Sequence, residues 1–271
     1  MRSVILVEFG APSNITELTE FLQNLTNHAP NYEELKNALK KYELINGSPL
    51  REKVEALSKA LAGLDEGLDV SYAFLYNKPL LSDVIDLKLK SGIDEIKVLP
   101  LFNFYSRRTA ADIDKAIKKY SKFTAVISQA YRADCLAGLW GERLKADIKK
   151  LNDFEVIFTA HSIPYDEDSQ YLQNVRGFVE RVGACAGIAD FKIGFQNARR
   201  GWLGPSIYDL NLGNSKNVVV VPVSFMLPNM EILYDLDVEY SSYLMHNGHR
   251  YVRSGPPEDL NKLAVCLKSL L

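Results

Sequence analysis

Two short stretches that lie far apart in the chain carry residues suited to holding a metal ion and accepting protons. The first, FTAHSIP, places His161 directly after an apolar run. The second, FMLPNMEILYDLDVEY, carries Glu231, Asp235 and Glu239 at intervals of four residues. Imidazole and carboxylate groups are ligands of transition-metal ions, and a neutral imidazole accepts a proton near neutral pH. Together the two stretches predict a site where a metal ion enters a partner molecule that loses protons.

Both stretches also have a plainer interpretation, because a lone histidine is often structural and an acidic helix face is often only solvated. His161 nevertheless follows the strand-like run EVIFTA, so we expect it at the carboxyl end of a strand. An α-helix is predicted from near Pro228 to Asn247, with Glu231 in its first turn. Four-residue steps drift by about 40° on an α-helix, so the three carboxylates form one stripe. We expect this stripe to lead a hydrated divalent cation towards Glu231.

Short β-rich segments alternate with segments of helical period along the chain. Such alternation predicts crossover connections, parallel sheets and helices on both faces of each sheet. The second half repeats the order of the first, and a proline interrupts the third strand of each half. Pro100 and Pro222 therefore mark the points where these strands leave their sheets. The predicted strands are SVILVEF, VSYAFLY, IKVLPLF and FTAVISQ in the first half, and FEVIFTA, FKIGFQ, NVVVVPVSF and RYVRS in the second.

The repeat predicts an α/β fold of two similar domains, at residues 1–130 and 150–256, joined near residues 128–152. The last segment, 257–271, reads as an amphipathic helix that can dock on either domain, including the first. Parallel sheets bind ligands beyond the carboxyl ends of their strands, which predicts a ligand cleft between the domains. The candidates for this cleft directly follow the strands: Phe9, Tyr76, Asn103–Arg108, His161, Gln196 and Met226–Glu231.

Composition excludes several classes of function. The chain has 271 residues, of which 47% are hydrophobic, and its net charge of −2 gives no reason to expect nucleic acid or an anionic membrane as a partner. The first apolar run, MRSVILVEFG, is too short for a signal peptide or a membrane span, so we expect a cytoplasmic protein, and a monomer. The fingerprints of dinucleotide-binding enzymes, P-loop enzymes, serine hydrolases and zincins do not occur.

The cysteine pattern is uninformative about metals. Cys135, Cys185 and Cys266 are widely spaced, and no C-x-x-C pair occurs. Such spacing argues against a zinc or iron–sulfur site built from neighbouring cysteines. We expect all three to be free thiols in a reducing compartment.

Six segments, taken in order, make the chain similar to the ferrochelatase family, whose members insert ferrous iron into a porphyrin. The resemblance extends from about residue 3 to residue 256. It implies two Rossmann-like domains, each a four-stranded parallel sheet flanked by helices, with the porphyrin in the cleft between them. The matching segments are VEFGAP, YELINGSPL, LPLFNFYSRRT, FTAHSIP, GFQNARRGWLGP and VVPVSFMLPNMEILYDLDVEY.

The resemblance also implies roles for individual residues. The family's invariant histidine falls on His161, and the acidic residue paired with it across the cleft falls on Glu231, which implies that these two are catalytic. The further carboxylates of the same helix fall on Asp235 and Glu239, which implies a metal path made of all four side chains. The porphyrin-binding positions, taken from the resemblance and from the strand ends together, are Phe9, Tyr76, Tyr105, Ser106, Arg107, Arg108, Gln196 and Trp202.

The implied substrates are ferrous iron and either protoporphyrin IX or coproporphyrin III, with no cofactor required. The cysteines of the family's occasional iron–sulfur cluster are missing, so no cluster is expected. The segment after Gly10 lacks the arginines of many relatives, which leaves Arg107, Arg108, Arg199 and Arg200 as candidates for binding the porphyrin carboxylates. Two alternatives stay open: a cobalt or nickel chelatase for a more carboxylated tetrapyrrole, and a carrier that binds porphyrin or haem without turnover.

Overall fold

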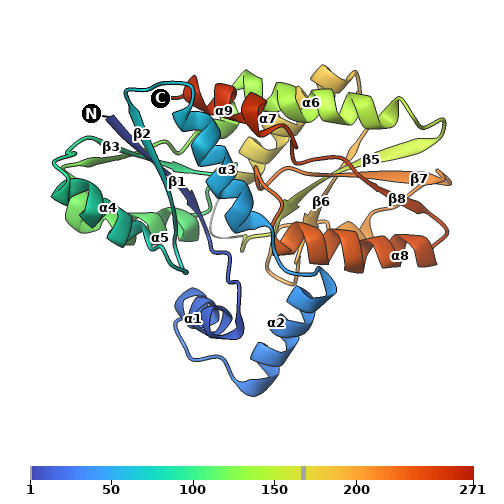
Figure 1. Ribbon diagram of the computed structural model, residues 1–271. Coiled ribbons are helices and arrows are strands. Elements are labelled where there is room, and N and C mark those ends of the chain that lie inside the picture. Colours follow the sequence, from blue (N-terminus) through green and yellow to red (C-terminus); the bar gives the residue numbers. More distant parts are fainter. Residues whose placement is uncertain (1, 166–168) are drawn as a thin grey trace.

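A computed structural model describes residues 2–165 and 169–271 and contains two four-stranded parallel sheets (Figure 1). The strand order is β2-β1-β3-β4 in the first sheet and β6-β5-β7-β8 in the second, so the two halves share one topology. The predicted α/β fold of two similar sheets is therefore confirmed. The strands are β1 (Arg2–Glu8), β2 (Leu68–Phe74), β3 (Ile96–Pro100), β4 (Thr124–Val126), β5 (Phe154–His161), β6 (Lys192–Gln196), β7 (Asn217–Pro222) and β8 (Arg250–Arg253).

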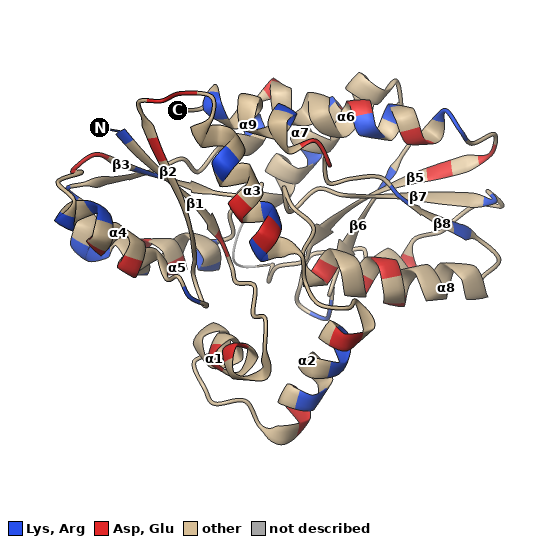
Figure 2. Ribbon diagram, in the orientation of Figure 1, with Lys and Arg blue, Asp and Glu red and all other residues tan. Residues whose placement is uncertain are grey.

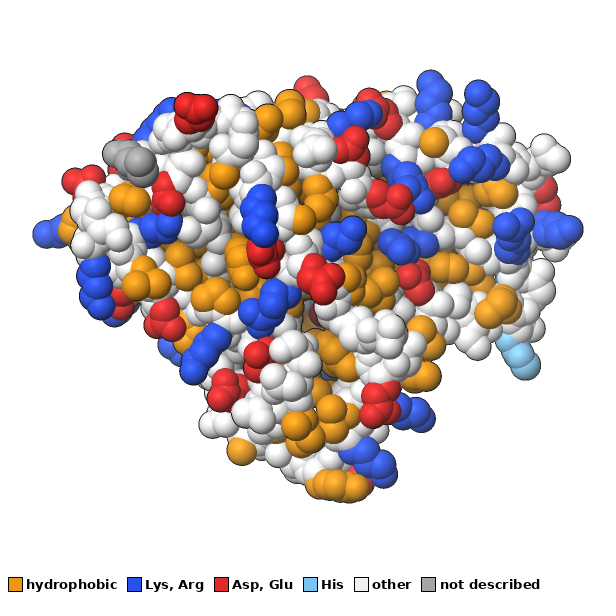
Figure 3. Space-filling view, in the orientation of Figure 1, with side chains coloured by type: hydrophobic (Ala, Val, Ile, Leu, Met, Phe, Trp, Pro, Cys, Tyr) orange, Lys and Arg blue, Asp and Glu red, His pale blue; other side chains and the backbone are white. Residues whose placement is uncertain are grey.

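Helices cover both faces of the sheets, and α1 and α2 project from the body of the molecule (Figure 1). In the described residues no helix is both long enough and apolar enough to cross a membrane. On the face shown in Figure 3, basic and acidic side chains are interspersed. The helices are α1 (Ile15–Thr26), α2 (Tyr32–Leu44), α3 (Leu50–Ala62), α4 (Leu81–Lys90), α5 (Arg107–Ile117), α6 (Asp134–Ile148), α7 (Ser169–Ala186), the π-helix η4 (Glu231–Tyr240), α8 (Ser241–His246) and α9 (Leu260–Lys268), with short 3₁₀ turns η1 (Lys118–Tyr120), η2 (Ala130–Arg132) and η3 (Ile207–Asp209).

Two hydrophobic cores lie on opposite faces of the sheets. Successive residues of a strand point to opposite faces, so Leu6 of β1 enters one core and Val7 enters the other. The first core includes residues of α3, α6, α7 and α9, and the second includes residues of α4, α5 and η4. Both cores contain strand residues from both sheets. The domain boundaries at residues 130 and 150 therefore stay predictions, because the packing is continuous across them.

The two sheets are joined where β3 and β7 leave them at Pro100 and Pro222. The exit segments run antiparallel and exchange backbone hydrogen bonds across the molecule. The amide of Asn103 donates to the carbonyl of Ser224 at 2.8 Å, and the amide of Met226 donates to the carbonyl of Leu101 at 2.9 Å. This pairing fixes the two carboxyl edges against each other and thereby shapes the space between them.

The projecting helices α1 and α2, which we call the lip, are attached through a dense polar contact. Arg51 of α3 donates to the carbonyl of Ala11 and to the side chains of Asn77 and Glu17 at 2.9–3.1 Å. Gly10 allows α1 to approach closely, since a Cβ at this position would lie 2.5 Å from the Phe21 ring. No helix was predicted for residues 13–30, which are mostly polar and include α1.

The helix that carries the acidic residues differs from the predicted one. It is π-helical from Glu231 to Tyr240, and only its continuation α8 is α-helical (Figure 1, orange). The prediction of one α-helix to Asn247 was therefore wrong in its hydrogen bonding. The apolar residues Ile232, Leu236 and Tyr240 are buried at strict four-residue intervals. These residues place one face of the helix in the second core.

A disulfide bond joins Cys135 of α6 to Cys266 of α9, with their Cα atoms 5.7 Å apart. The prediction of three free thiols is wrong for these two residues, and Cys185 is free. The bonded residues are 131 positions apart and meet only because α9 packs on α3 and α6. Local spacing cannot reveal such a pair, and cysteine usage therefore gives no support to a reducing compartment.

Candidate active site

A cavity of about 430 Å³, which we call the cleft, lies where the carboxyl ends of the two sheets face each other. Its wall includes Phe9 after β1, His161 at the end of β5 and Glu231 at the start of η4. The lip adds residues such as Phe21 and Tyr42. A cavity of this size, at this edge of parallel sheets, has the usual dimensions and position of a small-molecule site.

His161 is held with one ring nitrogen free for chemistry. Its backbone amide donates to Ser224 Oγ at 2.9 Å, and its backbone carbonyl accepts a hydrogen bond from Tyr171 Oη at 2.8 Å. Nδ1 lies 2.6 Å from the carbonyl oxygen of Ser162, which can only accept, so this nitrogen carries the proton. In the neutral ring Nε2 is then unprotonated, and it lies 3.8 Å from Glu231 Oε1. The two predicted catalytic residues therefore meet in the cleft.

Glu231 is partly buried, and one of its two carboxylate oxygens lacks a hydrogen-bond partner among the described residues. Its Oε2 is buried and has no hydrogen-bond partner in the described part of the chain, although 30% of the side chain is exposed. Burial raises the pKa of Glu231, the nearby Asp235 charge adds to the rise, and His161 and Lys41 oppose it. The raised pKa favours the protonated form of this carboxyl relative to an exposed one, which suits a group that exchanges a proton for a metal ion.

The remaining acidic residues of η4 occupy different surroundings. Asp235 is buried, and its carboxylate accepts from Lys41 Nζ at 3.4 Å and from Asn197 Nδ2 at 3.2 Å, whereas Glu239 is exposed. Figure 2 shows acidic positions along the helix labelled α8 and its preceding turns, and both basic and acidic positions along α2. Within residues 2–165 and 169–271, no three His, Cys, Asp or Glu side chains gather closely enough to hold a metal ion. The three acidic residues among the predicted metal ligands follow one another along η4, and His161 lies at the end of β5.

Three aromatic residues of the first half line the cleft as one cluster that we call the aromatic wall: Phe9, Tyr76 and Phe102. The ring of Phe9 stacks on Phe102 at 4.8 Å and on Tyr76 at 6.0 Å between centroids, and Phe225 meets it edge-on at 6.1 Å. Tyr76 is oriented by its hydroxyl, which donates to Asp112. A stacked apolar surface of this kind suits a flat, apolar ligand.

The other predicted porphyrin-binding residues divide into two groups. Ser106, Arg108 and Trp202 line the cleft with Phe9 and Tyr76, and the guanidinium of Arg199 lies 3.9 Å above the Trp202 ring. Three further residues are not among the described residues that line it. Tyr105 packs on Phe102 behind the wall, Gln196 is buried beside His161 on the neighbouring strand, and Arg107 is exposed at the start of α5.

The sequence analysis missed Glu8, Tyr42 and Tyr171, which all line the cleft. Glu8 is 0% exposed, and burial together with the Glu231 charge raises its pKa to about 8. Burial also raises the pKa of Tyr42 and Tyr171, again with a smaller effect from Glu231. One signal was available for Glu8, because it is an acidic residue at the end of the otherwise apolar run SVILVE.

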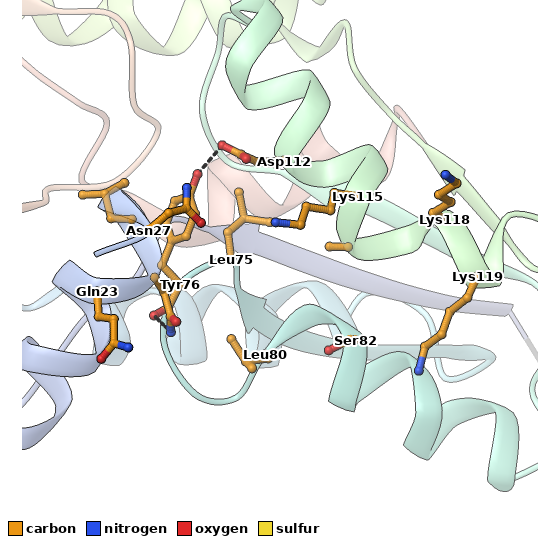
Figure 4. Close-up of a pocket in the computed structure, with 13 residues that line it drawn as sticks. Gln23, Asn27, Leu75, Tyr76, Leu80, Ser82, Asp112, Lys115, Lys118 and Lys119 are labelled. Atoms are coloured by element: carbon orange, nitrogen blue, oxygen red, sulfur yellow. Dashed lines mark hydrogen bonds between the residues drawn. The ribbon is translucent and has the colours of Figure 1, made fainter. Parts of the chain in front are cut away.

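A second hollow, of about 940 Å³, opens on the other side of Tyr76 (Figure 4). Its described lining includes Lys115, Lys118 and Lys119 and contains neither histidine nor glutamate. Tyr76 and Asp112 line both spaces, and their hydrogen bond lies at the border between them. Of these two spaces, only the smaller cleft is lined by His161 and Glu231, the predicted catalytic residues.

Comparisons with known proteins agree with this geometry. The ferrochelatase family model matches residues 1–271. A ferrochelatase of Thermoplasma acidophilum is 30% identical over 268 residues, which cover 95% of this chain and 86% of the relative. A coproporphyrin III ferrochelatase of Lactococcus lactis is 27% identical over 214 residues, covering 74% of this chain and 67% of the relative.

Two solved structures show the same fold at low sequence identity. SirB from Bacillus subtilis, determined with Fe³⁺, has a TM-score of 0.64 at 13% identity and covers 99% of this chain and 94% of its own. CbiX, the terminal enzyme of sirohaem biosynthesis in denitrifying bacteria, has a TM-score of 0.62 at 14% identity and covers 100% of both chains. With a family match over its whole length, the chain belongs to the ferrochelatase family.

Proposed function

We propose that the protein inserts ferrous iron into protoporphyrin IX or coproporphyrin III, with His161 and Glu231 as its catalytic residues. Its family makes it an enzyme that inserts a metal ion into a porphyrin. The observation that carries the finer proposal is the His161 Nε2 atom, unprotonated in the neutral ring and 3.8 Å from Glu231 Oε1 in the cleft. This pair supplies a base and a metal ligand at one point.

The reaction requires two protons to leave. A free porphyrin carries two pyrrole N–H groups, and both protons are released as the dication takes their place. His161 accepts one pyrrole proton at Nε2, because its Nδ1 proton is held by the Ser162 carbonyl. The His161 side chain is 31% exposed, so it can release this proton to solvent and then accept the second. Glu231 binds the incoming metal ion through a carboxylate oxygen, which its unpartnered Oε2 leaves available. Burial favours neutral Glu231 in the empty cleft, and an approaching dication favours the carboxylate.

Asp235 and Glu239 supply the route for the metal ion. Glu239 is exposed to solvent, whereas Asp235 is buried between it and Glu231 along η4. Each position offers oxygen ligands that exchange readily with water on a divalent ion. Lys41 Nζ forms an ion pair with the Asp235 carboxylate at 3.4 Å, and the lysine side chain is partly exposed. Such a pair is weak, so an incoming metal ion can displace Lys41 from Asp235.

The porphyrin binds against the aromatic wall, where ring stacking supplies apolar contact. Arg108 and Arg199 line the cleft and are exposed, so their guanidinium groups can pair with substituent carboxylates at its mouth. Two such cations match the two carboxylates of protoporphyrin IX and half of the four of coproporphyrin III. This supports a porphyrin of few carboxylates as the substrate over a more heavily carboxylated tetrapyrrole.

A steady-state assay tests this function. Fe²⁺, Co²⁺ and Ni²⁺ are each offered with protoporphyrin IX, coproporphyrin III and a more carboxylated tetrapyrrole, without any added cofactor. We expect the highest kcat/KM for Fe²⁺ with one of the first two. A preference for Co²⁺ or Ni²⁺ with the third would contradict the proposal, and product limited to one equivalent would indicate a carrier instead of an enzyme.

A further inference from the structure

Glu8 occupies a position that the fold alone does not explain. It is the last residue of β1, is 0% exposed and lines the cleft together with His161 and Glu231. Its Oε2 accepts a long hydrogen bond of 3.4 Å from the amide of Phe9, and its Oε1 has no partner in the described part of the chain. A buried polar oxygen without a partner destabilises a fold, so a ligand is the natural explanation for it.

Two arginines of the first half, Arg51 and Arg108, form hydrogen bonds with groups other than Glu8. Arg51 is bound to Ala11, Asn77 and Glu17, while Arg108 donates to the carbonyl of Leu25. In residues 2–165 and 169–271, Glu8 takes part in no ion pair. Burial raises its pKa to about 8, and a carboxylic acid in the neutral form can both donate and accept a hydrogen bond.

We propose that Glu8 is a further substrate-contacting residue, whose free oxygen hydrogen-bonds to the nitrogen atoms at the centre of the bound porphyrin. This inference rests on the proposed function. Glu8 and the next residue, Phe9 of the aromatic wall, both line the cleft. A ring that fills the cleft therefore lies within reach of both side chains.

The chemistry of the two partners is complementary. The centre of a free porphyrin presents two N–H donors and two bare nitrogen acceptors in the ring plane. A protonated carboxyl matches both kinds, since its hydroxyl donates and its carbonyl oxygen accepts. Contact with these nitrogens orients the ring while His161 acts on a pyrrole proton.

The test compares Glu8→Leu and Glu8→Gln with the wild-type protein. We expect Glu8→Leu to raise Tm, because an unpartnered buried carboxyl is replaced by an apolar group of similar size. We also expect its affinity for metal-free porphyrin to fall by about tenfold and its kcat for metal insertion to fall at least as far. Glu8→Gln keeps hydrogen-bonding atoms in place and retains affinity within about threefold.

Thr159→Val is the matched control. Thr159 is also 0% exposed with an unpartnered Oγ1, but it is not among the described residues that line the cleft. This variant is expected to gain stability and to bind and metallate porphyrin as the wild type does. An equal loss of affinity in Thr159→Val, or unchanged affinity and turnover in Glu8→Leu, would overturn the proposal.

The two proposals fail in different ways. Binding of metal-free porphyrin is measured by its absorbance without any metal, so it does not depend on metal insertion. A wild-type protein that binds porphyrin but inserts no iron would refute the proposed function, while the affinity of Glu8→Leu would still decide whether Glu8 touches the ring.

Discussion

The two halves of the molecule share one topology and differ in what they place at the ends of their strands. β1 and β5 occupy the same position in their sheets, yet β1 leads into Phe9 of the aromatic wall and β5 ends in His161. After the third strand of each half, β3 leads to Phe102, whereas β7 leads to Glu231. The same scaffold thus provides an aromatic wall on one side of the cleft and ionisable groups on the other.

In the proposed function this difference gives the two walls separable tasks, with the first half holding the ring and the second half handling protons and metal. Glu8 departs from this division, because it is a buried ionisable group contributed by the first half. Variants on each side therefore test whether binding and chemistry can be lost independently.

The largest effect is expected for Glu231→Gln. The amide is isosteric but binds metal ions poorly and carries no charge, so we expect the insertion rate to fall by about 10²–10⁴-fold. Single-turnover absorbance with excess enzyme measures this step. Glu180→Gln, at an exposed position on α7 that does not line the cleft, is the control and should change the rate by less than about threefold. A near-wild-type rate in Glu231→Gln would remove this residue from the mechanism.

A variant of the aromatic wall should lose porphyrin affinity and keep its insertion rate. Phe9→Ala removes the ring that stacks on Phe102 and Tyr76, and we expect the affinity for porphyrin to fall by about 10–100-fold. At saturating porphyrin the insertion rate should stay close to that of the wild type. Phe123→Ala removes a partly exposed ring that does not line the cleft, and serves as the control. Loss of rate at saturation in Phe9→Ala would break the division of tasks.

A smaller effect is expected along the metal route. Asp235→Asn combined with Glu239→Gln removes two negative charges from η4 without changing side-chain size. The metal concentration for half-maximal rate should rise by about 3–10-fold, with the porphyrin affinity unchanged. If the metal dependence is unchanged, these two carboxylates are only a solvated face and a structural ion pair.

A separate prediction concerns stability against pH and not activity. The pKa of Glu8 is about 8 in the folded protein and near its ordinary 4.5 in the unfolded chain. The folded state therefore binds more protons between these values, so stability is highest at low pH and falls as pH rises towards 8, by at most about 1.4 kcal/mol per pH unit. In Glu8→Gln this contribution disappears, and its Tm should depend less on pH over that window. Parallel Tm curves for the two proteins would contradict the burial of an ionisable Glu8.

The fold was largely predictable because its signals are local. All eight predicted strands occur, and β3 and β7 end at the predicted prolines, Pro100 and Pro222. The placement of His161 followed from the rule that parallel strands present their carboxyl ends to one edge. The approach of His161 to Glu231 needed the resemblance as well, since the two residues lie on different elements.

What could not be predicted depends on packing between distant segments. The burial of Glu8 arises from elements on all sides of β1, and the Cys135–Cys266 bond arises from the contact of α6 with α9. Tyr42 reaches the cleft because the lip folds over it, which the polar sequence of that region does not indicate. The π-helical hydrogen bonding of η4 had no signal in the sequence, because a four-residue repeat of apolar residues fits an α-helix equally well.

The claim that the two walls have separable tasks is tested most directly by His161→Ala. The insertion rate and the affinity for metal-free porphyrin are measured on one preparation of this variant. The rate should fall by about 10²–10⁴-fold, because the proton acceptor is gone, while the affinity stays within about threefold of the wild type. Insertion at a near-wild-type rate, or loss of porphyrin binding in step with the rate, would contradict the account.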